Sequence, residues 1–143
     1  MAKARKPSRS AAKSQPRRTA KPATLTSLPA IGTTWNGGIY AGLSLENEKP
    51  VALVLLPGDL DDGPWDDAVS WAKKQGGVLP SRIDQLVLLQ NLKSEFKPDW
   101  YWSGAPDAGD ESYAWCQDFT SGTQSNDRKY TKLRARAVRR VAI

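Results

Sequence analysis

Carboxylates are the side chains of this sequence that could bind a metal ion or a ligand together, and they cluster in two places. One group precedes a predicted helix and the other fills a short loop: Asp59, Asp61, Asp62, Asp66 and Asp67 in the first, Asp107, Asp110 and Glu111 in the second. Calcium takes roughly six to eight oxygen ligands, and the loop could contribute part of such a set. Solvated loop acids and acids at a helix N-terminus account for the same pattern, and we favour that interpretation. We therefore treat the loop acids as candidate ligand-binding residues and predict no metal site and no cofactor.

The residue types needed for nucleophilic catalysis are nearly absent. The chain has no His and a single Cys, Cys116, which excludes a His-assisted triad, an intramolecular disulfide and a Cys/His zinc site. Cys116 stands in a predicted strand between two bulky residues, which favours a buried and inert thiol. No pair of carboxylates has a spacing that selects the two facing acids of a glycosidase. We predict that the protein is not an enzyme.

Basic residues are concentrated at the N-terminus. The first thirty residues contain no acid, and the rest of the chain has 21 − 8 = 13 basic against 15 acidic residues, a net charge of −2. With almost no large apolar side chain, residues 1–30 are predicted to be a disordered basic arm that precedes a domain at 31–143. The arm could contact nucleic acid through its charge, or serve only as a solubilising tether. Its candidate anion-binding residues are Lys3, Arg5, Lys6, Arg9, Lys13, Arg17, Arg18 and Lys21.

A second basic group closes the chain. It consists of Arg134, Arg136, Arg139 and Arg140. On one face these residues could bind an anionic partner such as an acidic polysaccharide or a nucleic acid. The alternative is a solvated edge strand whose charges discourage edge-to-edge pairing.

No segment of the sequence is apolar enough to be a signal peptide or a membrane span. The N-terminus is polar throughout, and the longest apolar run, residues 51–56, is far shorter than the roughly 20 residues that a spanning helix needs. We expect a soluble protein without a signal peptide.

The elements that would position these residues follow from hydrophobic periodicity. Residues 38–45 alternate, with Ile39, Ala41, Leu43 and Leu45 on one predicted face, and the apolar run 51–56 is typical of a strand covered on both faces. The two strands predict a hairpin whose second strand is central.

Two helices are predicted after the hairpin. The first is capped by Asp62 or Gly63 and buries a stripe of apolar residues at helical spacing. The second begins at Ser81, which forms a capping box with Asp84, and ends before Pro98. Its predicted buried stripe consists of Ile83, Leu86, Leu89 and Phe96, widened by Val87, Leu88 and Leu92.

Three strands are predicted in the last third of the chain, of which the last runs over residues 132–143. The first two belong to the stretch 99–119, which holds six of the twelve aromatic residues. We expect most of these rings in the core, because each buries roughly 150 to 250 Å². Recognition would then use the loop 103–112, with Tyr101 as the exposed aromatic. The whole pattern predicts an α+β fold with two helices packed on short antiparallel strands.

Five motifs in order resemble a known family. Residues 37–42 (GGIYAG), 64–89 (PWDDAVSWAKKQGGVLPSRIDQLVLL), 101–104 (YWSG), 113–122 (YAWCQDFTSG) and 134–141 (RARAVRRV) resemble the C-type-lectin-like domain of collagen-like bacterial adhesins, which also occurs alone in many phages and prophages. The resemblance covers roughly residues 36–143 and implies a fold whose first and last strands pair. The motifs of calcium-dependent sugar binding are missing, which implies calcium-independent recognition.

The resemblance implies a class of function rather than one activity. It favours a virion-associated binding or structural module located in a virion or in the host cytoplasm, docking on other virion or surface proteins. Because the adhesins associate as trimers, the resemblance implies a homo-oligomer, a trimer by analogy. Two alternatives stay open: a variable receptor-binding protein of a diversity-generating retroelement, and a nucleic-acid-binding accessory protein that acts through the basic arm.

Overall fold

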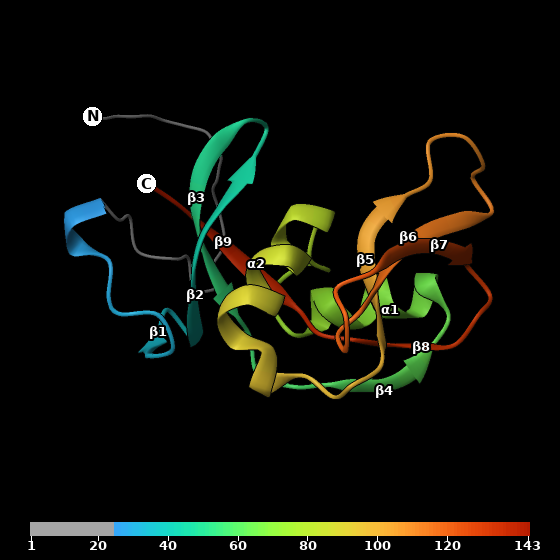
Figure 1. Cartoon of the computed structure of the whole chain (residues 1–143), viewed down its shortest axis with the longest axis horizontal. Helices are drawn as coiled ribbons and strands as arrows, with labels where there is room; N and C mark the ends of the chain where they lie inside the picture. The colour runs from blue at the N-terminus through green and yellow to red at the C-terminus, as the bar shows by residue number, and fades with distance from the viewer. Residues whose placement is uncertain (1–24) are drawn as a thin grey trace.

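The structure, a computed structural model, describes residues 25–143. Within this range there are two α-helices, and nine strands form two sheets. Helix α2 contacts both sheets (Figure 1). The α+β class was predicted correctly. The helices are α1 (Trp65–Lys74) and α2 (Arg82–Leu92), with the 3-10 turns η1 (Leu25–Ser27) and η2 (Lys93–Glu95). The strands are β1 (Thr34–Trp35), β2 (Gly38–Glu46), β3 (Lys49–Leu55), β4 (Leu60–Gly63), β5 (Trp100–Pro106), β6 (Tyr113–Asp118), β7 (Gln124–Arg128), β8 (Leu133–Ala135) and β9 (Val138–Ala142).

The first sheet has the strand order β1-β2-β3-β9. The predicted hairpin is confirmed as β2 and β3, and residues 51–56 are buried throughout because β3 has a strand on each side and side chains packed on both faces. The expected pairing of the first and last strands is wrong, since β9 pairs with β3 and not with β1 or β2. The last strand therefore adds to β3, which gives the apolar strand a neighbour on each side.

The face of β2 differs from the predicted alternation. A bulge lies between Tyr40 and Gly42, and Gly42 has a φ of 112°, a conformation that glycine adopts without strain. The extra residue shifts the pleat, so that Ser44 points toward α2 while Leu43 and Leu45 are each 44% exposed. The predicted single apolar face is wrong for this reason.

The second sheet has the order β4-β8-β5-β6-β7. It contains two strands, β4 and β7, at positions where the sequence predicted no strand. The predicted strand at 132–143 is in fact β8 and β9, which belong to different sheets. The break falls at Arg136, whose buried guanidinium donates to the carbonyls of Leu56 and Glu95 and holds the crossing segment in place.

Helix α1 covers the second sheet. Its N-cap is Pro64, which provides no side-chain cap, so the predicted cap at Asp62 or Gly63 is wrong. Ala68 and Ala72 are its fully buried residues. Small side chains at these positions let the helix approach the sheet closely.

Helix α2 begins with the predicted capping box of Ser81 and Asp84, which is confirmed. The predicted stripe is wrong at Ile83 and Leu86, which are 45% and 49% exposed. The helix instead buries Asp84 and Gln85, because both side chains have hydrogen-bond partners in the neighbouring strands. Helical periodicity alone predicts that polar residues are exposed. Asp84 and Gln85 are buried instead because each has specific hydrogen-bond partners.

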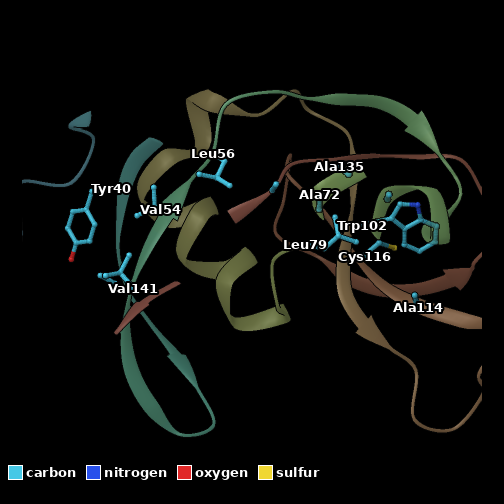
Figure 2. Packing of buried hydrophobic residues seen from close by; sticks show 13 residues of the cluster. Tyr40, Val54, Leu56, Ala72, Leu79, Trp102, Ala114, Cys116, Ala135 and Val141 are labelled. Carbon is cyan, nitrogen blue, oxygen red and sulfur yellow. The ribbon is translucent and has the colours of Figure 1, made fainter. Parts of the chain in front are cut away.

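The core has two clusters of buried apolar residues. One includes Tyr40, Val54 and Val141 at the first sheet and Trp102 and Cys116 at the second, as Figure 2 shows. The other packs α2 between the two sheets, through Leu53, Leu55, Leu88, Leu92, Tyr101 and Phe119. Leu28 also packs against the first cluster, so the packed part of the chain includes residues that the sequence assigned to the arm.

Candidate functional site

Tyr101 is not available for recognition. Its side chain is 2% exposed, its ring meets Phe96 and Phe119 edge-to-face with centroids 5.1 Å apart, and its hydroxyl accepts a hydrogen bond from the backbone N–H of Lys97 at 2.9 Å. The prediction that Tyr101 is the exposed aromatic is wrong. Its face of β5 points toward α2, which covers it.

The loop acids lie at the surface and are satisfied locally. Asp107 accepts from the backbone N–H of Gly109 at 2.9 Å and from Asn126 Nδ2 at 2.5 Å. Asp110 accepts from the hydroxyl and the backbone N–H of Ser112, and these hydrogen bonds lower the pKa of its carboxyl. Glu111 is exposed. Among residues 25–143 no group of three or more His, Cys, Asp or Glu residues could hold a metal ion.

The C-terminal arginines do not share one face, so that expectation is wrong. Arg134 pairs with Asp99 at 3.0 Å and with Asp61 at 3.4 Å. Arg136 is buried, and burial lowers the pKa of its guanidinium. Both side chains belong to the segment that leaves the second sheet.

Arg139 and Arg140 are neighbours on β9 and therefore point to opposite faces of the sheet. Arg139 donates to the carbonyl of Asn36 at 2.6 Å. Arg140 donates to the buried carboxylate of Asp84 through Nε at 3.0 Å and Nη2 at 2.7 Å, and lies 3.5 Å from Glu46. Arg139 thus joins β9 to the turn between β1 and β2, and Arg140 joins β9 to the first turn of α2.

The eight basic residues predicted in the arm, Lys3 to Lys21, lie outside the described residues. Their role in binding an anionic partner stays a prediction.

The described residues bring a different set of side chains together on one face of β6 and β7. Tyr113 and Trp115 stand on the same face of β6, and their partners in register on β7 are Arg128 and Asn126. Arg82 and Tyr130 pack on these residues from α2 and from the end of β7. We call these six residues the β6/β7 face: Arg82, Tyr113, Trp115, Asn126, Arg128 and Tyr130.

Arg82 covers Trp115. Its Cζ lies 3.6 Å from the centroid of the Trp115 ring, and its Nε donates to Gln124 Oε1 at 3.0 Å. A guanidinium stacked on an indole at this distance gains a cation–π attraction and loses rotamer freedom. Gln124 is itself fixed, because its Nε2 donates to the carbonyl of Arg82 and to Gln117 Oε1, both at 2.9 Å. The Trp115 ring below the guanidinium and the Gln124 amide beside it thus hold the guanidinium in one orientation.

Arg128 is held in a similar way at the other end of the face. Its Nε donates to the Tyr113 hydroxyl at 3.0 Å and its Nη1 to the Tyr130 hydroxyl at 2.9 Å. The hydroxyls of Tyr130 and Tyr113 raise the pKa of this guanidinium, so it stays a cation at any physiological pH. Tyr130 is 69% exposed, so this end of the face is open to solvent.

Neither of these arginines has an acidic partner within the described chain. Over residues 25–143 the ion pairs within 4.0 Å involve Arg134 and Arg140 only. Besides the hydrogen bonds from Ser112, the charge of Arg128 lowers the pKa of the Asp110 carboxyl, and the two residues form no ion pair. The β6/β7 face therefore presents two cationic guanidiniums, and neutral side chains, Gln124 and the two tyrosines, fix their orientation.

Cys116 lies on the opposite side of β6 and contributes no nucleophile. It is 2% exposed, its Sγ donates to the carbonyl of Ser125, and burial raises the pKa of the thiol to about 12. The neutral thiol is unreactive near neutral pH.

Sequence reasoning missed this face, because it assigned the large rings of β6 to the core. The small residues Ala114 and Cys116 are the ones that point inward, where Trp102 and α1 already fill the space. A strand that alternates large and small residues next to a bulky core residue was the available signal. No signal in the sequence marked Arg82, because its contact with Trp115 joins positions far apart in the chain.

No helix among residues 25–143 is long and apolar enough to cross a membrane. No protein-family model matches the chain, and neither does any curated protein. The function must therefore be argued from the site.

Proposed function

We propose that this chain is a non-enzymatic binding and structural module, associated with phage or prophage virions, whose lectin-like domain docks on another virion or surface protein through the β6/β7 face. The observation that carries the proposal is the guanidinium of Arg82, stacked at 3.6 Å on Trp115 and anchored by Gln124. Such an arrangement orders a long side chain before any partner arrives, which lowers the entropic cost of binding.

The composition of the face supports docking on a protein. Arg, Trp and Tyr are the residue types that contribute most to protein–protein binding energy. The β6/β7 face consists of two Arg, one Trp, two Tyr and one Asn. The neighbouring residues Ile83 and Leu86 of α2 add exposed apolar surface at its edge.

Mass spectrometry of purified particles from induced host cells tests this function. We expect the chain among the particle proteins at a constant copy number relative to the known capsid components. Its absence from particles, while the chain is present in the same cells, would refute the proposal. The measurement does not depend on which side chains make the contact.

A further inference from the structure

The partner class of the β6/β7 face follows from what its two arginines lack. Nη1 and Nη2 of Arg82 and Nη2 of Arg128 have no hydrogen-bond partner among residues 25–143. Both guanidiniums are nevertheless oriented by neutral groups, Gln124 for one and two tyrosine hydroxyls for the other. Their remaining N–H groups are available to an acceptor from outside. A planar carboxylate fits the Nη1–Nη2 fork of Arg82 with two parallel hydrogen bonds, and Nη2 of Arg128 can donate a single charge-assisted bond.

Ring stacking is the weaker alternative for this face. A sugar or a nucleobase stacks on an open aromatic ring. Here the guanidinium of Arg82 lies over Trp115, and the hydroxyls of Tyr113 and Tyr130 accept from Arg128. The face thus presents oriented hydrogen-bond donors, whereas a site for ring stacking would leave its aromatic rings uncovered.

The two strand residues that support the arginines have the spacing of side chains in an extended peptide. Arg82 packs on Trp115 and Arg128 on Tyr113, two residues apart on β6, which is about 7 Å along a strand. In an extended segment, side chains at positions i and i+2 lie on one face with the same repeat. Two acidic residues at i and i+2 can therefore meet the two guanidiniums together.

An apolar contact continues the same path. Leu86 lies one turn beyond Arg82 on α2, so the two side chains are neighbours on the helix surface. Leu86 is 49% exposed and Ile83 is 45% exposed. A segment that follows the face from Arg128 to Arg82 reaches this apolar pair next.

We propose that the β6/β7 face binds an extended acidic segment of a partner protein, with carboxylates at alternating positions on Arg128 and Arg82 and an apolar side chain on Leu86 and Ile83. This inference rests on the proposed function and names the partner chemistry of the same face. Charge complementarity carries it, because neither guanidinium forms an ion pair with a carboxylate of residues 25–143.

Fluorescence anisotropy with labelled peptides tests the inference on the full chain. One peptide alternates Glu with small residues and ends in Leu, and the matched peptide has Gln in place of Glu. The test variant is Arg82→Gln with Arg128→Gln. The control is Lys73→Gln with Lys74→Gln, which also removes two positive charges, but from exposed positions in the last turn of α1. Because the basic arm is present in every protein, its general attraction for acids cancels in the comparison.

We expect the wild type and the lysine control to bind the Glu peptide with similar affinity, and the arginine variant to bind it about tenfold more weakly, as for two exposed charge-assisted pairs. A second variant, Arg82→Lys with Arg128→Lys, keeps the charge and removes the planar fork, and we expect nearly the same loss. Urea midpoints close to that of the wild type confirm that the variants are folded.

Three results would overturn the inference. The arginine variant could bind the Glu peptide as well as the lysine control does, or the lysine-for-arginine variant could bind it as well as the wild type does. A single-stranded oligothymidylate could show the dependence on Arg82 and Arg128 while the Glu peptide shows none, which would make the partner a nucleic acid. In each case the presence of the chain in particles is a separate result, so the proposed function can survive the failure of this inference.

Discussion

The buried carboxylate of Asp84 connects three elements, and removing its charge should be the most damaging small change in the protein. It is 0% exposed and accepts from Ser44 Oγ at 2.5 Å, from the Ser81 N–H at 2.9 Å and from Arg140 Nε and Nη2 at 3.0 and 2.7 Å. These contacts tie β2, the start of α2 and β9 together. The substitution Asp84→Asn keeps the size of the side chain and removes the charge.

The cost follows from what happens to Arg140. Its side chain is 16% exposed, and its other acidic partner, Glu46, is 3.5 Å away and half exposed. Leaving a buried charge without its partner costs about 3–5 kcal/mol of unfolding free energy, and domains of this size have roughly 5–15 kcal/mol in total. By contrast Glu46→Gln, which breaks only the exposed pair, should cost at most about 1 kcal/mol.

Urea unfolding followed by tryptophan fluorescence measures this directly. With a slope of about 2 kcal/mol per molar urea, Asp84→Asn should lower the midpoint by roughly 2 M. Adding Arg140→Met should recover part of the loss, because the two changes then remove the pair together, and the coupling should be at least about 1 kcal/mol. A midpoint shift for Asp84→Asn no larger than that for Glu46→Gln would refute the reasoning, as would strict additivity in the double variant.

Three further predictions concern the core. Burial raises the pKa of Cys116 to about 12 from an ordinary 9.0, so the native state keeps a proton that the unfolded chain loses. Stability should therefore fall as pH rises from about 9 to about 12, and urea midpoints across this range should fall less in Cys116→Ala; equal declines would contradict it. A Cβ on Gly77 would overlap the backbone carbonyl of Val138, so Gly77→Ala should cost about 1–3 kcal/mol by thermal unfolding, whereas Gly109→Ala, whose Cβ would make only an ordinary contact with Asp107 Oδ1 at 3.6 Å, should be nearly neutral. Tyr101→Phe should cost about 1 kcal/mol for its lost hydrogen bond and leave peptide binding by the β6/β7 face unchanged; a loss of binding would return Tyr101 to the site.

Local signals in the sequence predicted several elements correctly. The apolar run at 51–56 indicated a strand with neighbours on both sides, and Ser81 with Asp84 indicated the start of α2. These features depend on residues close together in the chain. The same holds for the α+β class, which follows from the order of the periodic segments.

The errors arose where contacts between distant residues override a local pattern. The bulge at Gly42 turns Leu43 and Leu45 outward, and no local signal distinguished it from an ordinary strand glycine. The burial of Asp84 depends on Arg140, which follows it by 56 residues. Helical periodicity therefore placed Ile83 and Leu86 inside wrongly, although it was right for Leu88 and Leu92.

The candidate site was mislocated for the same kind of reason. The loop acids and the C-terminal arginines were visible as charge clusters, but hydrogen bonds and ion pairs within the chain satisfy most of them. The oriented cations of the β6/β7 face arise from a contact between α2 and β6. Only the fold brings Arg82 and Trp115 together.

The copy number of the chain in purified particles, compared among variants, tests the central claim most directly. The claim is that the β6/β7 face docks the protein on its partner. We expect particles to contain the Lys73→Gln, Lys74→Gln control at the wild-type level and to lose most of the Arg82→Gln, Arg128→Gln variant. Equal incorporation of the two variants, together with loss of a chain whose eight arm Lys and Arg residues are all Gln, would contradict the account and assign docking to the arm.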